Sequence, residues 1–366
     1  MNLQAKRMKE LFGYAATLTK EQGPVVMAGR AAGFFKRRFL GKRARYLPSS
    51  KALAAQRAAD TSGFPVISIL PPRDHAPKPF LEQFLDSVQN QTSPRWQLCL
   101  VDASDEAHPE VGQLVQARAA KDPRIVYQKI ENGGIAANTN AAARLATGEY
   151  LALADHDDML APHAIYCMGK ALAHTEADFA YSDEALFRKT PAGAHVAHFK
   201  PDYAPEYLMS VNYICHLAVF RRSLFEAVGR ERPECDGAQD HDLFLRLIDE
   251  MQRTDPKAKP LHLAQVLYYW RVHAASTSGG TGAKPYVLAA ARKAVADHLA
   301  ATGRQGRVED GLFPGTCHVV WDLPDPAPLV SILIPNKDHT DDLEKCLHSL
   351  YAKTFYENFE VIIIEN

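Results

Sequence analysis

The sequence predicts an α/β protein built on a mostly parallel, doubly wound sheet with flanking helices. Two observations predict this fold class. Short apolar runs typical of strands alternate with helical patterns over residues 49–172. Several of the runs end in acidic or glycine-rich segments, and ligands of such sheets bind beyond the carboxyl ends of the strands.

The first elements follow from their end signals. Residues 49–60 predict a helix, because Ser49 is a residue type that caps helix N-termini. A strand is expected at 64–70, and Pro71 and Pro72 end it because proline cannot donate a ladder hydrogen bond.

The later elements follow from periodicity. An expected helix at 80–90 has its apolar residues on one face, and each later strand is a short segment rich in apolar residues. The further expected strands are 96–102, 124–130 and 150–155, and the further expected helices are 112–120, 136–146 and 161–172.

A repeat begins near residue 329. The stretch "PVISILPPRDHA" from Pro65 resembles "PLVSILIPNKDHT" from Pro328, and "WQLCLVDAS" resembles "FEVIIIEN", in which Glu365 falls where Asp102 falls. Two matching strands predict the truncated start of a second copy of the first domain. We expect residues 1–48 to form a basic, helical leader and residues 49–305 to form the first domain. Residues 306–328 would be a linker, and residues 329–366 would be a fragment of the second copy.

The composition excludes several classes. With 46% hydrophobic and 23% charged residues the chain is ordinarily globular, and its net charge of −1 gives no reason to expect nucleic-acid binding. Six cysteines without a CxxC pair argue against a zinc site or a disulfide framework and fit a reducing compartment. No apolar run approaches the roughly 20 residues of a membrane span.

Charge is concentrated in residues 1–48, which carry eleven Lys or Arg and two Glu, a net +9. Aromatic and leucine residues alternate with these bases. One interpretation is peripheral contact with an anionic membrane, to which each base contributes about 1 kcal/mol. The alternatives are a solvated leader or a helix docked on a later domain.

The stretch "DHDD" at the end of the 150–155 strand brings Asp155, Asp157 and Asp158 together. Three interpretations compete. The carboxylates hold Mg²⁺ or Mn²⁺, which prefer carboxylate and phosphate oxygens. They form an EF-hand loop, although its glycine and glutamate are missing. Or they form a turn in which Asp158 caps the next helix. The position after a buried strand favours the metal site.

Further polar residues follow later elements. Asp183 and Glu184 follow an apolar run, and the alternative for them is an ordinary strand-end turn. Gln239, Asp240 and Asp242 open an amphipathic helix, where a capping role is the alternative. After the strand at "LYYW", Arg271 and His273 could meet a diphosphate and its metal ion, although a lone histidine is usually structural.

Together these motifs resemble the family 2 glycosyltransferases of the GT-A (Rossmann-like) fold. In order they are "ISIL-P", "LVD", "NGGIAANTNAA", "DHDD", "YSDE", "FKPDYAPEYL", "GAQDHDLFLRL" and "LYYWRVHAAS". The sequence is most similar to tandem bacterial enzymes of rhamnosyltransferase-like, O-antigen and polysaccharide synthesis type. Eight motifs in the family's order over residues 49–300 are far more specific than any one of them.

The resemblance implies roles for particular residues. The nucleoside pocket falls on Pro72 and Asp102, and the loop beside the nucleotide falls on Asn132, Gly133 and Gly134. Asp155 and Asp157 match the DxD motif, with Asp157 as the direct metal ligand. Asp240 matches the catalytic base. The residues implied near the diphosphate and the metal are Arg271 and His273, and those implied as neighbours or acceptor contacts are Asp158, Asp183, Glu184, Gln239 and Asp242.

The implied reaction is an inverting, metal-dependent transfer of a sugar from a nucleotide-sugar donor to a hydroxyl group of a growing surface glycan. A divalent cation would neutralise the diphosphate leaving group, and the base would take the acceptor's proton. The implied partners are a dTDP-, UDP- or GDP-linked donor and a glycan or lipid-linked saccharide acceptor. The expected location is the cytoplasm, with peripheral contact at the inner face of the plasma membrane.

Two other functions remain open. The first motif is "PPRDHA" where the family has a sequence closer to "PVYN", and Ala103 replaces the usual second acid after Asp102. These departures motivate a donor-dead module that binds acceptor or supports a catalytic second domain. A nucleotidyltransferase would need a glycine-rich basic loop after the first strand, and this stretch has no glycine.

Overall fold

The computed structural model describes residues 46–71, 77–105, 109–194, 196–273, 285–313 and 315–365. Most of the predicted basic leader and Pro72 lie outside these residues. Within the described ranges, no helix is both long enough and apolar enough to span a membrane.

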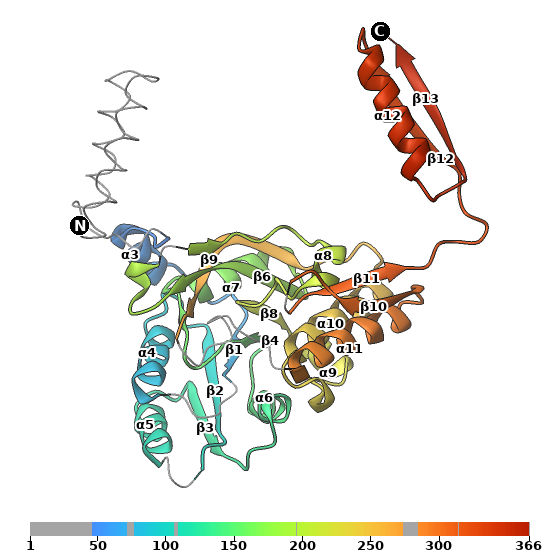
Figure 1. Ribbon diagram of the computed structural model, residues 1–366. Coiled ribbons are helices and arrows are strands. Elements are labelled where there is room, and N and C mark those ends of the chain that lie inside the picture. The colour runs from blue at the N-terminus through green and yellow to red at the C-terminus, as the bar shows by residue number, and fades with distance from the viewer. Residues whose placement is uncertain are drawn as a thin grey trace, which may run out of the picture.

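The first half of the main sheet is parallel, as the sequence predicts (Figure 1). Its four strands pair in the order β3-β2-β1-β4, and α4 (Lys78–Gln89), α5 (Pro109–Ala119) and α6 (Ile135–Arg144) connect them. The strands are β1 (Ile67–Leu70), β2 (Trp96–Asp102), β3 (Ile125–Lys129) and β4 (Tyr150–Leu153).

The second half of the sheet is mixed. Beyond β4 the strand order continues β8-β6-β9-β5, and β7 pairs with β6. Strand β8 is antiparallel to both β4 and β6, whereas β6 and β9 are parallel. The expectation of a mostly parallel sheet therefore describes the first half well and needs correction for the second. The strands are β5 (Met159–Leu160), β6 (Phe179–Phe187), β7 (Val196–His198), β8 (Ala218–Arg221) and β9 (Leu261–Arg271).

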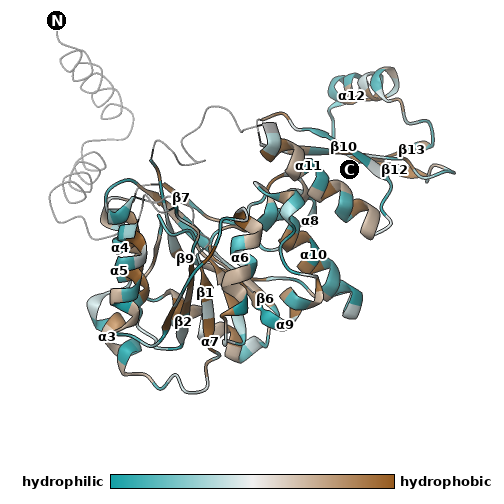
Figure 2. Cartoon of the chain, turned by 90° about the horizontal axis from the view of Figure 1, so that it is seen from below, coloured by the Kyte–Doolittle hydropathy of each residue, from teal (hydrophilic) through white to brown (hydrophobic). Residues whose placement is uncertain are grey.

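Both faces of the sheet are covered because its central strands are apolar on both sides (Figure 2). In β2, Leu98 and Leu100 pack into one core cluster with α4, α5 and α7 (Ala164–Thr175). The alternate residues Cys99 and Val101 pack into the opposite cluster with α6, α10 (Gln239–Thr254) and α11 (Pro285–Ala301). This two-sided burial holds the strand ends, and the residues that follow them, at one edge.

Shorter helices complete the first domain. Helix α3 (Ser50–Ala58) begins as predicted, with the Ser49 side chain accepting a hydrogen bond from Ala52 N at 3.2 Å. The others are α8 (Pro205–Ser210), α9 (Arg222–Ala227) and two 3₁₀ turns, η1 (Pro191–Gly193) and η2 (Pro233–Cys235).

The segment predicted as a linker contains an antiparallel hairpin, β10 (Gly306–Asp310) and β11 (Cys317–Trp321). Cys317 belongs to the core cluster that includes α10 and α11. The first domain therefore extends to Trp321, beyond the expected boundary at residue 305.

The C-terminal strands β12 (Val330–Asn336) and β13 (Phe359–Glu365) pair in parallel and are joined by α12 (Thr340–Lys353). In Figure 1 this unit stands apart from the main sheet. Ser331 pairs with Glu360, as Ser68 pairs with Gln97 in β1 and β2. The side-chain hydrogen bonds are alike too: the serine hydroxyl donates to Glu360 at 2.6 Å and to Gln97 at 2.7 Å. This equality of register supports the predicted repeat.

A buried ion network links α10 to its neighbours. Asp242 is 1% exposed and accepts hydrogen bonds from Arg232 and Arg246, and Arg232 also reaches Asp297 on α11. Replacing Asp242 with alanine would leave two guanidinium groups without their shared partner. Because both arginines reach solvent, we expect a loss on the order of 3 kcal/mol in the free energy of unfolding, the low end for a broken buried pair.

Urea unfolding of Asp242→Ala would measure this loss. Arg253→Ala is the matched control on the same helix, because Arg253 and Glu250 form an exposed pair expected to contribute no more than about 0.5 kcal/mol. Equal stability of the Asp242 variant and wild type would contradict a structural role for the network.

Candidate active site

Residues near the end of β9 hold the acidic loop after β4, residues 155–158, in place. The Tyr268 hydroxyl accepts a hydrogen bond from Asp155 N at 2.9 Å and donates one to Asp158 Oδ2 at 2.8 Å. Asp158 is 1% exposed, and its other oxygen accepts from Arg271 N at 2.6 Å. Asp158 therefore braces the loop, whereas Asp155 and Asp157 are partly exposed at its surface.

Crowding shifts the acidity of this loop. Burial raises the pKa of Asp158 well above its ordinary value, and the charges of Asp155 and Asp157 raise it further. The pKa of Asp155 is also raised, first by its partial burial and then by Asp157, while His216 opposes the shift. An arriving cation would relieve this repulsion, because a positive charge stabilises ionised carboxylates.

Arg271 and His273 lie against the loop in different ways. Arg271 is 1% exposed; its guanidinium donates to the Asp157 backbone carbonyl and to Gln83, and it stacks between Phe80 and Phe187. His273 Nε2 lies 2.8 Å from Asp157 Oδ2. In this conformation Arg271 orients the loop, and His273 contacts the predicted metal ligand directly.

Asp240 lies in the first turn of α10 and faces the same region. Its Oδ2 accepts from Asn212 Nδ2 at 3.0 Å, and its Oδ1 accepts from His241 N at 2.9 Å. Its charge contributes to the raised pKa of Asp155, so the two carboxylates are electrostatically close. A carboxylate offers about four acceptor positions, so Asp240 keeps capacity for a substrate hydroxyl.

The loop at Asn132, Gly133 and Gly134 turns the chain into α6. The Asn132 side chain accepts from Gly134 N at 3.1 Å, and Gly134 has a φ of 94°. A Cβ at Gly134 would lie 2.4 Å from Asp236 Oδ2, so only glycine fits there. Asp236 accepts from Ala136 N at 2.9 Å and so occupies the N-terminus of α6. Sequence reasoning missed Asp236, because it lies a hundred residues away.

Asp102 ends β2 beside a cavity of about 570 Å³. Its carboxylate is 1% exposed and accepts from Tyr127 Oη at 2.9 Å and from Ser104 N at 3.0 Å, with Lys129 Nζ 3.3 Å away. These partners lower the pKa of Asp102 against the opposing effect of burial. Residues lining the cavity are Ala103, Ser104, Asp105, Lys129, Ile130, Glu131 and Asn132, at the carboxyl ends of β2 and β3. Asp102, which the resemblance assigns to the nucleoside pocket, contacts Ser104 and Lys129 of this lining.

Asp183 and Glu184 lie inside β6, next to a register irregularity, and not after the strand end. Both are 2% exposed. Asp183 accepts from Lys200 N and from His262 Nε2, each at 2.9 Å. Burial would raise the pKa of Glu184, but a hydrogen bond from His198 and the charge of Lys200 outweigh it, so the pKa is lowered.

The remaining predicted residues act within their own helix region. Gln239 accepts from Gly237 N at 2.9 Å, which is a turn contact at the start of α10. Asp242 belongs to the ion network with Arg232 and Arg246, whereas Asp240 faces Asn212. Of the three polar residues that open α10, the structure therefore brings Asp240 toward the acidic loop.

His216 is a site residue that the sequence did not single out. Its Nε2 lies 3.6 Å from Asp155 Oδ2, and its ring stacks on Tyr268. Ligand atoms of Asp155, Asp158 and His216 lie within 4.8 Å of one another, a set of oxygens and one nitrogen that fits a divalent cation. The signal was a single histidine in an aromatic-rich segment, which by itself is more typical of a core position.

Residues 75–229 match the family described as Glycosyl transferase family 2. This chain contains a family 2 glycosyltransferase domain. The match begins before α4 and ends after α9, so it includes the loop at Asn132, the acidic loop and His216.

Curated relatives extend the similarity. The "O-antigen biosynthesis protein RfbC" of Myxococcus xanthus is 34% identical over 325 residues, which are 87% of this chain and 24% of that protein. The "Uncharacterized protein y4gI" of Sinorhizobium fredii is 38% identical over 305 residues, which are 82% of this chain and 33% of that protein. The chain thus spans a third or less of the length of these relatives. Among solved structures, S. aureus TarS 1–349 in complex with UDP aligns over 64% of this chain and 65% of that chain, with 15% identity and a TM-score of 0.49.

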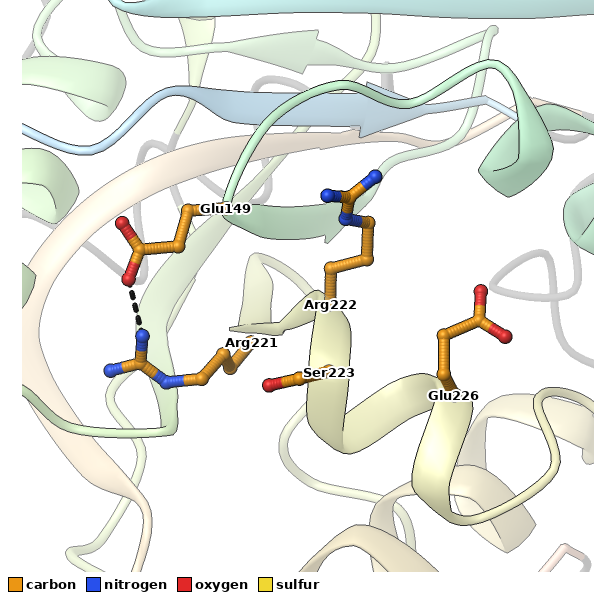
Figure 3. Close-up of a pocket in the computed structure, with 5 residues that line it drawn as sticks. All are labelled: Glu149, Arg221, Arg222, Ser223 and Glu226. Carbon is orange, nitrogen blue, oxygen red and sulfur yellow. Dashed lines mark hydrogen bonds and ion pairs between the residues drawn. The ribbon is translucent and has the colours of Figure 1, made fainter.

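A second cavity lies at the opposite end of β4 in the glycosyltransferase domain (Figure 3). It measures about 350 Å³, and Glu149, Arg221, Arg222, Ser223 and Glu226 line it. Arg221 forms ion pairs with Glu149 and Asp178 and stacks over Tyr150. The cavity lies at the other end of β4 from the acidic loop, so we leave it out of the candidate site.

Glu231 is a buried acid behind the site. It is 3% exposed, and its Oε2 has no hydrogen-bond partner among the described residues. Burial raises its pKa well above the ordinary value, and the charges of Asp240 and Asp236 add to the shift. The folded protein therefore retains the proton on Glu231 to a higher pH than the unfolded chain does.

We expect Glu231→Gln to remove a pH dependence of stability. A raised pKa stabilises the fold at low pH, and this contribution is lost by about 1.4 kcal/mol per pH unit as the pH rises from about 4.5 toward the folded-state pKa. Glutamine cannot ionise, so the variant should gain stability relative to wild type over this window. Urea unfolding of both proteins between pH 5 and 8 measures the difference, and parallel pH profiles would contradict the assignment.

Proposed function

We propose that this domain transfers a sugar from a nucleotide-sugar donor to a hydroxyl group of a growing bacterial surface glycan, with inversion and with a divalent cation. The observation that carries the proposal is the grouping of Asp155, Asp157, His273 and Asp240 at the sheet edge where the cavity beyond β2 and β3 also opens. The family match supplies the reaction class.

The cation, Mg²⁺ or Mn²⁺, would act as a Lewis acid on the donor diphosphate. Asp157 and Asp155 would hold it through their exposed oxygens. Arg271 and Asp158 keep the loop in place, because their own hydrogen-bonding groups are used within the protein. The cavity beyond β2 and β3 would take the nucleoside of a dTDP-, UDP- or GDP-linked sugar.

Asp240 would accept the proton of the acceptor hydroxyl, a glycan or a lipid-linked saccharide. Proton transfer to a positioned carboxylate contributes about 10²–10⁴-fold to the rate. Asn212 supports this role because its Nδ2 holds Asp240 Oδ2, while its own buried Oδ1 has no partner among the described residues. An acceptor hydroxyl could therefore meet both groups.

The test is release of nucleoside diphosphate and labelled glycan from a donor panel, with Mn²⁺ or with EDTA. We expect metal-dependent turnover of one donor by wild type. Transfer that survives both Asp157→Ala and Asp240→Ala would refute the assignment. A folded domain that binds donor but never turns it over would favour the module that serves a second domain.

We also propose that residues 329–366 begin a second copy of this domain and that the basic leader contacts an anionic membrane at the cytoplasmic face. The repeat has the register of β1 and β2 as its support, and the leader has its +9 charge. Liposome co-sedimentation of the chain with and without residues 1–48 tests the second proposal, since equal pelleting would refute it.

A further inference from the structure

The backbone of His216 is held on both sides by a buried ion pair. Lys200 Nζ donates to the His216 carbonyl at 2.7 Å and to the Ile214 carbonyl at 2.9 Å. On the other side, His216 N donates to Glu184 Oε2 at 2.7 Å. The two charged groups lie 3.6 Å apart, with side-chain exposures of 4% and 2%.

Burying an ion pair costs free energy, because both charges lose their hydration, unless further hydrogen bonds satisfy them. Here those bonds run largely to one short backbone segment, residues 214–216. The pair therefore fixes where the His216 side chain begins. It acts through main-chain atoms, which every amino acid except proline would keep at position 216.

The imidazole ring is fixed as well. It stacks on Tyr268, with centroids 4.9 Å apart and planes 19° from parallel. The same Tyr268 hydroxyl binds Asp155 N and Asp158 Oδ2, so ring and acidic loop share one support. His216 Nε2 lies 3.6 Å from Asp155 Oδ2, too far for a good hydrogen bond and close enough for both atoms to bind one ion. The same nitrogen also contacts Cys215 Sγ at 2.9 Å, a weak partner that an arriving cation would displace.

We propose that His216 is a nitrogen ligand of the divalent cation, beside Asp155, and that Lys200 and Glu184 are positioning residues for it. This inference rests on the proposed metal-dependent function. His216 approaches the site from a third segment of the chain. The other two are the acidic loop, which carries Asp157, and the residues after β9, which carry His273. Asp158 belongs to the same group of ligand atoms within 4.8 Å, and we assign it chiefly to support of the loop because its oxygens accept from Tyr268 Oη and Arg271 N.

An imidazole ligand has a consequence for metal choice. Mg²⁺ prefers oxygen ligands and binds nitrogen poorly, whereas Mn²⁺ binds a given nitrogen-containing site more tightly. We therefore expect wild type to bind Mn²⁺ more tightly than Mg²⁺. Replacing His216 with glutamine should weaken Mn²⁺ binding about 10- to 100-fold and reduce the preference for Mn²⁺ over Mg²⁺.

The experiment measures Mn²⁺ binding by the decrease of the free-ion electron paramagnetic resonance signal, and Mg²⁺ by competition. It uses the full chain as wild type, His216→Gln and His216→Asn. The control is His198→Gln, because His198 contacts the same Glu184 at 2.8 Å but lies on its other side. Circular dichroism checks that each variant is folded, and two variants at position 216 guard against one that does not fold.

The positioning role has its own readout. Lys200→Met should weaken Mn²⁺ binding although Lys200 touches no ion, and Lys200→Arg should restore part of it. The inference is overturned if both His216 variants bind Mn²⁺ as wild type does, or if His198→Gln weakens binding equally. Absence of any Mn²⁺ binding by wild type would overturn the metal-dependent function too, so the two failures are distinguishable.

Discussion

Replacing Asp157 with asparagine should reduce sugar transfer by at least about 100-fold. Asp157 is partly exposed at the end of the acidic loop, and His273 contacts its Oδ2 at 2.8 Å. Asparagine keeps the size of the side chain but removes the charge that a cation needs. Loss of metal assistance costs several kcal/mol of transition-state stabilisation, which converts to a factor of 100 or more.

The measurement is the initial rate of transfer at several Mn²⁺ concentrations. A weakened site should recover partly at high Mn²⁺, whereas a misfolded protein should not. Asp86→Asn is the matched control, because Asp86 is an exposed acid on α4 that pairs with Arg118 away from the loop. Wild-type rates in Asp157→Asn would remove Asp157 from the metal site.

Replacing Asp240 with asparagine should lower kcat by about 10²–10⁴-fold, the usual contribution of a general base. Donor affinity should change little, because we assign Asp240 to the acceptor's proton and not to the diphosphate. The Asn212 contact can be kept, since the amide oxygen still accepts from Asn212 Nδ2, whereas the hydrogen bond from His241 N to the second oxygen is lost.

Steady-state kinetics with varied donor separates kcat from KM for this variant. Glu250→Gln, on the exposed face of the same helix, should leave both constants unchanged. A large rise in the donor KM with an unaltered kcat would mean that Asp240 binds donor, and would contradict its role as base.

The parallel half of the fold could be predicted because its signals are local. Residues 96–102 form a strand with the predicted bounds, since a segment that is apolar from Leu98 to Val101 suits burial on both faces. Ser49 marked the start of α3 in the same way. In both elements the neighbouring residues alone decide the local structure.

The second half of the sheet was not predictable from such signals. Strand β8 pairs antiparallel with β4, and no neighbouring residue specifies that partner. Asp183 and Glu184 looked like residues after a strand because acids rarely lie inside one. They lie within β6 because Lys200, His198 and His262 satisfy them from distant segments.

The residues of the candidate site also fall into two groups, those that local sequence signals predict and those that only the fold brings together. Asp155, Asp157 and Asp240 follow element ends, where a sequence pattern points to them. Asp236 and His216 come from positions a hundred and about sixty residues from the loops they meet, so only the folded chain brings them there. Arg271 shows the converse case, because the motif was found but its guanidinium is enclosed by Phe80 and Phe187 in this conformation.

The central claim is that this domain itself binds a nucleotide sugar through a cation held by the acidic loop. Calorimetric titration of UDP-, dTDP- and GDP-sugars into wild type and Asp157→Ala, with Mn²⁺ or with EDTA, tests it most directly. We predict that one donor binds wild type only with Mn²⁺ and that Asp157→Ala abolishes this binding. Absence of binding by folded wild type to every donor, or equal binding in EDTA and in Asp157→Ala, would contradict the account.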